Sequence, residues 1–335
     1  MICLYPNAGL EGAANPYLGI VRDGLKLRGV GVVGWRWRIV LRPPAALVLS
    51  WAEYRWLPAA TRWGCVRRRA GRALLLTQLR VLKLRGTVIV HVAHNAKPHR
   101  WDDSQEEWDN RFHAYLKVVD ATAFLTLSAR EHRAFTRLRG KPWCVMPHPH
   151  YALLPACEFE AARTRISQLV FLGGLAARKD ALDAISLSSR LPDLEVVVTG
   201  SGDAPRLRER IGSDGGRPVT LVEGHLSDTD LHDLLRAPTA VVLTQRDALN
   251  SGVVFLALSR GAVVICPDNP TNLELQAEFG PSWMRTFDGV LDEERLTALL
   301  EEPIPAELPD LTHRTPEKVV AGLLELTDRV RGASR

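Results

Sequence analysis

Two hydrophobic patterns alternate along the chain. Short apolar runs rich in β-branched residues predict strands, and segments whose apolar residues recur every three or four positions predict helices. Because the two patterns alternate, we expect parallel sheets joined by crossover helices. The expected strands are residues 1–5, 45–49, 87–92, 121–127, 143–146, 168–172, 194–199, 219–222, 239–244 and 263–266.

The alternating pattern occurs twice, before and after the proline-rich segment Pro147–Ala156 (PHPHYALLPA). We therefore predict an α/β fold with two Rossmann-like domains that face each other across a cleft. The first domain spans residues 1–150 and the second spans residues 151–315. A C-terminal helix and tail, residues 316–335, follow them. The length of 335 residues suits two domains of ordinary size.

Composition places the chain among globular proteins and separates its halves by charge. Hydrophobic residues make up 46% of the chain, which is enough for buried cores. Residues 1–155 hold 24 basic and 10 acidic side chains, whereas residues 156–335 hold 19 and 28. We expect the basic half to meet an anionic partner. Nucleic acid, anionic lipid and a phosphorylated substrate all qualify.

The cysteines and the apolar runs bear on the compartment. The five cysteines are scattered and form no CxxC pair, so we expect a reducing environment without disulfides or a zinc site. The chain opens with no basic segment followed by a long apolar one. Its apolar runs are shorter than the ~20 residues that cross a bilayer. These features predict a cytoplasmic protein.

A basic amphipathic segment, Arg62–Arg85, stands out in the first half, with leucines at helical spacing. Such a helix could lie on an anionic membrane, on the inner face of the plasma membrane, with its apolar side down. It could equally be a surface helix with solvated arginines, and the sequence favours neither alternative. The tryptophans that would suit a membrane interface are Trp35, Trp37, Trp56 and Trp63.

The tripeptide Asn250-Ser251-Gly252 stands where an expected strand gives way to a helical pattern. In parallel sheets, ligands bind outside the carboxyl ends of the strands, where helix N-termini present unpaired amides and a partial positive charge. Asn250 or Ser251 can cap such a helix, and Gly252 lets a phosphate approach the backbone. A capped helix without a ligand is the slightly favoured alternative on spacing alone.

Three other loops follow expected strands of the second half in the same way. GGLAARKD carries Gly174, Arg178 and Lys179; GSGD carries Gly200; and PDN leads to Glu274. A lysine together with a helix N-terminus would suit a diphosphate. Neither the glycines nor the cations are specific by themselves, because surface lysines are usually only solvated.

Taken in order, these segments resemble a known family. FLGGLAARKDALDAI, LEVVVTGSGDAP, VEGHLSDTDLHDLLRAPTAVVLTQ and ALNSGVVFLALSRGAVVICPDNPTNLEL resemble the donor-binding domain of GT-B glycosyltransferases that use nucleotide-sugars. IVHVAHNAKPH, VMPHPHY and VLSWAEY in the first half fit the same class; the last of these resembles a family segment that ends in Trp-Pro-Glu. The chain looks most similar to bacterial enzymes that build surface polysaccharides or glycolipids, over nearly its whole length.

The resemblance implies that the first domain binds the acceptor and the second binds the donor. Lys179 would contact the donor pyrophosphate, with Asn250, Ser251 and Gly252 cradling it at the helix N-terminus. Glu274 would lie near the donor, and the loop that holds His225 would lie near the base. His94 would face the donor sugar. The family pattern is absent at Ala248 and Leu256, where many related enzymes carry glutamates.

The resemblance predicts transfer of a sugar from a nucleotide-diphosphate sugar to an acceptor hydroxyl of a glycan or glycolipid. Cations and amides would stabilise the leaving diphosphate electrostatically, without a metal or other cofactor. An inverting enzyme also needs a base, and the candidates are Glu11, Glu53, His94 and Asp102. The alternatives are a non-catalytic scaffold of the same fold, because the two glutamates are missing, and a basic nucleic-acid-binding protein. No nucleic-acid-binding motif accompanies the basic half, so we do not expect nucleic acid as a partner. A sugar-nucleotide epimerase would need several acids and histidines around the sugar, and the sequence shows no such set.

Overall fold

The structure is a computed structural model. It describes residues 1–6, 16–57, 61–95, 112–151, 165–173, 179–191, 193–200, 205, 207–209, 219–224, 226–236, 238–246 and 248–333. The chain divides into two compact units. Unit 1 comprises Met1–Pro149 together with Thr312–Arg335, and unit 2 comprises His150–Leu311.

Unit 1 is built on a six-stranded sheet in the order β2-β1-β3-β4-β5-β6, and every neighbouring pair is parallel. β1, β3, β4 and β5 are buried along their whole length, because apolar side chains on both of their faces are covered. The strands are β1 (Ile2–Tyr5), β2 (Val32–Gly34), β3 (Ala46–Ser50), β4 (Val88–Ala93), β5 (Ala121–Phe124) and β6 (Trp143–Val145).

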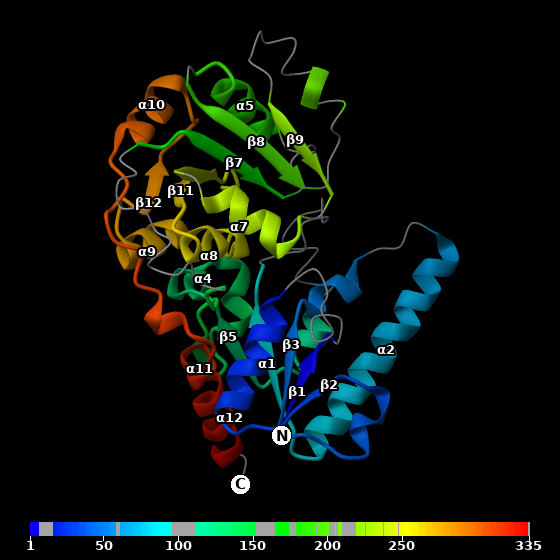
Figure 1. Cartoon of the computed structure of the whole chain (residues 1–335). Helices are drawn as coiled ribbons and strands as arrows, with labels where there is room; N and C mark the ends of the chain where they lie inside the picture. Colours follow the sequence, from blue (N-terminus) through cyan, green and yellow to red (C-terminus); the bar gives the residue numbers. More distant parts are fainter. Residues whose placement is uncertain are drawn as a thin grey trace. The chain divides into compact units, whose positions relative to one another are not determined.

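The helices of unit 1 come from both ends of the chain, as Figure 1 shows. Val320, Leu323 and Leu326 of the C-terminal helices enter the same apolar core as Leu18 and Leu25. The α-helices are α1 (Tyr17–Leu27), α2 (Arg62–Leu84), α4 (Leu127–Glu131), α11 (Pro316–Val319) and α12 (Ala321–Ala333). The 3-10 helices are η2 (Trp37–Val40), η3 (Ala52–Trp56), η4 (Arg133–Leu138) and η6 (Thr312–Arg314).

Close backbone approach fixes the C-terminal segment on unit 1. A Cβ added to Gly24 of α1 would lie 2.1 Å from the carbonyl oxygen of Pro316, so only glycine fits there. The buried guanidinium of Arg314 donates a hydrogen bond to the carbonyl of His148 at 3.0 Å. The chain therefore returns to the first unit after completing the second.

Unit 2 repeats the architecture with the strand order β12-β11-β10-β7-β8-β9, again with every pair parallel. The strands are β7 (Gln168–Leu172), β8 (Glu195–Gly200), β9 (Thr220–Glu223), β10 (Thr239–Val242), β11 (Val263–Pro267) and β12 (Met284–Phe287). The helices are α5 (Lys179–Ser188), α7 (Asp228–Arg236), α8 (Gly252–Ser259), α9 (Pro270–Phe279) and α10 (Glu293–Glu301).

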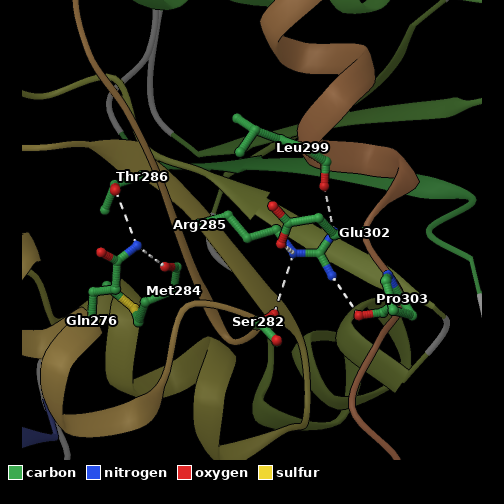
Figure 2. A network of polar contacts seen from close by, with 8 residues as sticks. All are labelled: Gln276, Ser282, Met284, Arg285, Thr286, Leu299, Glu302 and Pro303. Atoms are coloured by element: carbon green, nitrogen blue, oxygen red, sulfur yellow. Dashed lines mark hydrogen bonds and ion pairs between the residues drawn. The ribbon is translucent and has the colours of Figure 1, made fainter.

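A buried arginine fastens the edge strand β12 (Figure 2). The Arg285 guanidinium donates hydrogen bonds to the carbonyls of Ser282, Leu299 and Pro303, and it lies 3.6 Å from the carboxylate of Glu302. These acceptors come from the segment before the strand and from the end of α10. The arginine thus holds α10 against the sheet by satisfying backbone carbonyls.

The predicted parallel sheets are confirmed, and each of the ten expected strands is present. β2 and β12 escaped prediction because one has three residues and the other interrupts its apolar pattern with Arg285. Thr126 caps the short helix α4, and its hydroxyl accepts a hydrogen bond from the Ala129 amide at 3.1 Å.

Candidate functional site

Unit 2 has its topological switch point between β7 and β10. These two strands are neighbours, whereas the chain continues from β7 to β8 on the other side. Ligands in doubly wound sheets bind where the connections diverge in this way. The segment after β7 leads to Lys179 at the start of α5, and the segment after β10 leads to Gly252 at the start of α8. Both sequence-predicted phosphate loops therefore start at the switch point.

The start of α8 is open to a ligand in one specific respect. Ser251 occupies the N-cap position, with φ −138° and ψ 112°, and its side chain makes no capping hydrogen bond. Asn250, Ser251 and Gly252 are all half-buried. A helix start of this kind presents first-turn amides and the positive end of the helix dipole. The arrangement can bind an anion.

The neighbouring loop braces this segment. Asn269 caps α9 by accepting a hydrogen bond from the Asn272 amide at 2.8 Å, and its side-chain nitrogen donates to the Arg246 carbonyl at 3.0 Å. Asn269 thereby ties the segment after β10 to the segment after β11. Sequence reasoning missed this residue, although Asn-Pro before a helical pattern is a capping signal. The predicted donor residue Glu274 is half-buried within α9.

The packing of the strands requires a glycine at position 200, whether or not a ligand binds there. Its φ is 132°, and an added Cβ would lie 2.3 Å from the carbonyl oxygen of Gly173. The Gly173 amide in turn donates to the Thr199 carbonyl at 3.0 Å. The ends of β7 and β8 therefore approach so closely that a side chain at position 200 would clash. A ligand contact at Gly200 stays a prediction.

Several predicted residues lie outside the residues that the structure describes. These are Glu11, Gly174, Arg178, His225 and Asp102. Lys179 begins α5, but the position of its side chain is not described.

The carboxyl edge of the sheet in unit 1 gathers the candidate proton-transfer groups. Glu53 lies in η3, directly after β3, and His94 directly follows β4. Because β3 and β4 are parallel neighbours, both segments leave the sheet at the same edge. The switch point of this sheet, between β1 and β3, lies at that edge as well.

Glu53 is a buried carboxyl with little to stabilise its charge. It is 3% exposed, and neither carboxylate oxygen makes a well-formed hydrogen bond within the described part of the chain. Burial raises the pKa of Glu53 to about 7, against smaller lowering contributions from its own backbone amide and the Asn95 side chain. Glu53 can therefore gain or lose a proton near neutral pH.

His94 is buried as a neutral imidazole. Its ring stacks on Trp51 at 4.3 Å and 16° and meets the ring of Tyr17 edge-on at 4.9 Å. Both ring nitrogens lack a hydrogen-bond partner among the residues described. Burial first, and then the neighbouring His148 and His91, lower the pKa of His94 well below its ordinary value. The neutral imidazole can donate one hydrogen bond to a ligand from one ring nitrogen and accept one at the other.

Trp51 holds His94 in place through an unusual backbone. Its φ of 51° lies in the left-handed region, which is costly for a bulky residue and is often found at functional sites. A second buried pair lies close to Glu53: His91 Nδ1 is 3.1 Å from the Tyr115 hydroxyl. Sequence reasoning missed Trp51, Tyr115 and His91 in these roles. A histidine inside the apolar strand TVIVHV was the available signal.

The basic helix predicted at residues 62–85 is present as α2. Thr61 caps it, and only Leu75, Leu79 and Leu82 are buried. Trp63 is 79% exposed and Trp37 is 64% exposed. Trp56 instead is 2% exposed and packs on Phe112 and Tyr115, so its predicted place at a membrane interface is wrong.

Two features are absent from the described residues. No three His, Cys, Asp or Glu side chains in this part of the chain are grouped so that they could hold a metal ion. No helix among them is long and apolar enough to span a bilayer.

No family model matches the chain. It is similar to known glycosyltransferases in sequence and in structure. A GDP-mannose:glycolipid 4-beta-D-mannosyltransferase of Xanthomonas campestris is 27% identical over 275 residues, which cover 80% of this chain and 75% of the relative. The structure of Anabaena HepE in complex with UDP and glucose matches 99% of this chain and 98% of its own, with a TM-score of 0.59 and 10% identity. AviGT4, a glycosyltransferase involved in avilamycin A biosynthesis, matches 99% and 97% with a TM-score of 0.55 and 15% identity.

Proposed function

Because the chain is a GT-B glycosyltransferase by its fold and by its sequence relatives, we propose that it moves a sugar from a nucleotide-diphosphate sugar to a hydroxyl of a glycolipid or polysaccharide intermediate. One observation supports the proposal beyond the enzyme class. The carboxyl edge of the sheet in unit 1 holds a carboxyl with a pKa of about 7 and an imidazole whose two nitrogens have no hydrogen-bond partner among the described residues. Such groups suit chemistry on a sugar hydroxyl.

In this proposal unit 2 binds the donor diphosphate. The amides at the start of α8 and the cation of Lys179 stabilise the negative charge that develops as the diphosphate leaves. The uncapped N-terminus of α8 and its place beside the switch point support this role. No metal is required for this stabilisation, so we expect transfer to persist in EDTA. Complete loss of activity that Mn²⁺ restores would refute this part.

Glu53 is the proposed proton acceptor for the acceptor hydroxyl. A base works best when its pKa lies near the working pH, and burial brings the pKa of Glu53 to about 7. The pKa of His94 is lowered well below its ordinary value, so we assign to His94 a hydrogen bond with the sugar instead. Both side chains are buried, so the acceptor must displace the groups that cover them. Glu53 as a base implies inversion, and NMR of the anomeric centre in the product tests this.

A thermal-shift screen tests the donor site. UDP, GDP, dTDP and their sugars would be compared, with GDP-mannose first because the Xanthomonas relative is named for it. A nucleotide at ~100 times its dissociation constant should add about 2.7 kcal/mol of apparent stability. Transfer to lipid-linked acceptors would then be followed by mass spectrometry. Absence of any shift together with absence of transfer would contradict the proposal.

The proposal also includes a peripheral membrane position. Outside its three buried leucines, α2 exposes Trp63, Leu74 and Leu84, and the helix carries seven basic and no acidic residues. An amphipathic helix of this composition binds anionic lipid surfaces. We expect Trp63→Ser to weaken flotation with anionic vesicles, while Trp35→Ser, on the half-buried tryptophan beside Tyr5, serves as the control. Wild-type protein that ignores anionic vesicles would exclude this position.

A further inference from the structure

A basic pocket lies at the opposite edge of the sheet in unit 1, away from Glu53 and His94. It measures about 420 Å³ and is lined by Arg80, Lys83, His113, Ala114, Lys117 and Val118. The end of α2 leads into β4, and residues 117–120 lead into β5. The Asp120 carboxylate, which accepts from the Ile89 amide at 2.9 Å, connects the two segments. The pocket therefore lies at the amino ends of β4 and β5.

The pocket gathers positive charge with only partial neutralisation. Lys83 pairs with Asp120 at 2.5 Å and donates to the Val118 carbonyl at 3.3 Å. Arg80 and Lys117 have no ion pair within the described ranges, and both are exposed. Like charges gathered at one concave surface repel each other, so a bound anion would stabilise the group.

Two further cations extend the positive field around the pocket. Arg137 Nη1 lies 3.5 Å from His113 Nδ1, and the Lys141 ammonium donates to the Val119 carbonyl. The pKa of Lys141 is lowered by burial first and by Lys83 second, while Asp120 acts in the opposite direction. The second contribution is repulsion between Lys141 and the lining residue Lys83. Among the residues that line the pocket and the described residues just named around it, Asp120 is the acidic one.

We propose that this pocket binds a phosphate-bearing ligand. The guanidinium of Arg80 can bind two phosphate oxygens at once, and the ammonium of Lys117 adds a second positive charge. Ala114 and Val118 supply an apolar wall for whatever the phosphate is attached to. The volume suits a diphosphate or a phosphorylated headgroup. Such a site is separate from the proposed donor site, which lies in unit 2.

Calorimetry with inorganic pyrophosphate on the full chain, at fixed ionic strength, provides the first arm of the test. In the Lys179→Ala background, which weakens the proposed donor site, the added pair Arg80→Gln/Lys117→Gln should weaken binding at least tenfold. The control pair Lys26→Gln/Arg36→Gln in the same background removes the same charge from exposed sites elsewhere in unit 1 and should leave binding unchanged. Lys179→Ala should also bind pyrophosphate at this pocket, which separates this proposal from the donor site. The signal of ¹⁵N-labelled His113, assigned with His113→Gln, should shift saturably.

The second arm identifies the source of the phosphate. Vesicles of phosphatidylcholine, with and without phosphatidylglycerol, would be offered to the same proteins. Pyrophosphate binding that depends on Arg80 and Lys117 identifies a soluble phosphate compound. Binding only to phosphatidylglycerol vesicles, reduced more in the pocket variant than in the control variant, identifies a lipid headgroup. Binding of neither probe, or equal losses in the two double variants, would overturn the proposal.

Discussion

The carboxyl edges of the two sheets present opposite kinds of surface. In unit 1 the edge holds Glu53 and His94, which are 3% and 2% exposed and whose side-chain polar atoms make no well-formed hydrogen bond in the described part of the chain. In unit 2 the edge holds the half-buried Ser251 and Gly252 at a helix start without a side-chain cap. Both edges belong to parallel six-stranded sheets. In our proposal the same architecture serves proton chemistry in one unit and anion binding in the other.

The difference comes from what surrounds each edge. Aromatic rings cover the polar groups in unit 1, and this desolvation shifts the pKa values of Glu53 and His94. In unit 2, the start of α8 offers backbone amides, which carry only partial charges. A buried group tuned for chemistry costs folding stability, whereas a backbone cradle costs little. The predictions below use this contrast.

Glu53→Gln should have the largest effect, because it removes the proposed proton acceptor but keeps the side-chain volume. We expect kcat to fall by ~10²–10⁴ with little change in donor affinity. Release of nucleotide diphosphate over time measures this. Glu325→Gln on the exposed side of α12 is the control. A Glu53→Gln enzyme with wild-type kcat would remove Glu53 from the mechanism.

The stability cost of Glu53 should depend on pH. Its pKa is about 7 in the folded protein, above the ordinary value of 4.5. The native state therefore holds the proton more tightly, and this stabilisation is present below pH 4.5 and lost as the pH rises to 7. Relative to Glu53→Gln, the wild type should lose about 3 kcal/mol of unfolding free energy over this window. Urea unfolding at several pH values measures this loss. If the free energy of unfolding depended on pH in the same way in both proteins, that would contradict the raised pKa of Glu53.

Gly200→Ala should destabilise unit 2 through a steric clash at the edge of its sheet. The added Cβ would lie 2.3 Å from the Gly173 carbonyl oxygen at a φ of 132°. Gly224→Ala is the matched control, because Gly224 also has a positive φ, 98°, but open space around it. We expect Gly200→Ala to cost about 2 kcal/mol more than the control in urea unfolding. Equal costs would mean that backbone conformation alone explains the glycine.

His94→Phe should have the smallest effect on stability, and in the opposite direction. Phenylalanine keeps the stacking on Trp51 and removes two buried nitrogens that have no hydrogen-bond partner in the described ranges. We expect the free energy of unfolding of the variant to be about 1 kcal/mol higher than that of the wild type. Sugar transfer should become slower. Thermal unfolding and the transfer assay measure the two effects. A strongly destabilised variant would show that the imidazole is a structural group.

Much of the fold could be predicted from local patterns. Apart from β2 and β12, the strands of both sheets and the loops at their carboxyl ends follow from apolar runs punctuated by glycine, asparagine and serine. The patterns could not show that α11 and α12 pack on unit 1. The apolar stripe of α12 fits any complementary core, and the close contact between Gly24 and Pro316 joins residues far apart in the sequence. Burial of Trp56 was missed for the same reason.

The candidate site was accessible in part. Glu53 and His94 could be named from their segments, but the raised pKa of Glu53 depends on burial that only the folded chain creates. The stacking of His94 on Trp51 joins segments that follow two different strands. The brace that Asn269 provides is likewise a tertiary contact. The pattern of a single sequence shows which residue types follow each strand. It does not show which of these residues come into contact.

Calorimetric binding of a nucleotide diphosphate to the wild type, Glu53→Gln and Lys179→Ala tests the central claim most directly. The account assigns binding to unit 2 and proton transfer to unit 1. It predicts that Glu53→Gln binds the nucleotide as tightly as the wild type, whereas Lys179→Ala binds it at least tenfold more weakly. Equal loss of affinity in both variants, or no nucleotide binding by the wild type, would contradict this division of roles.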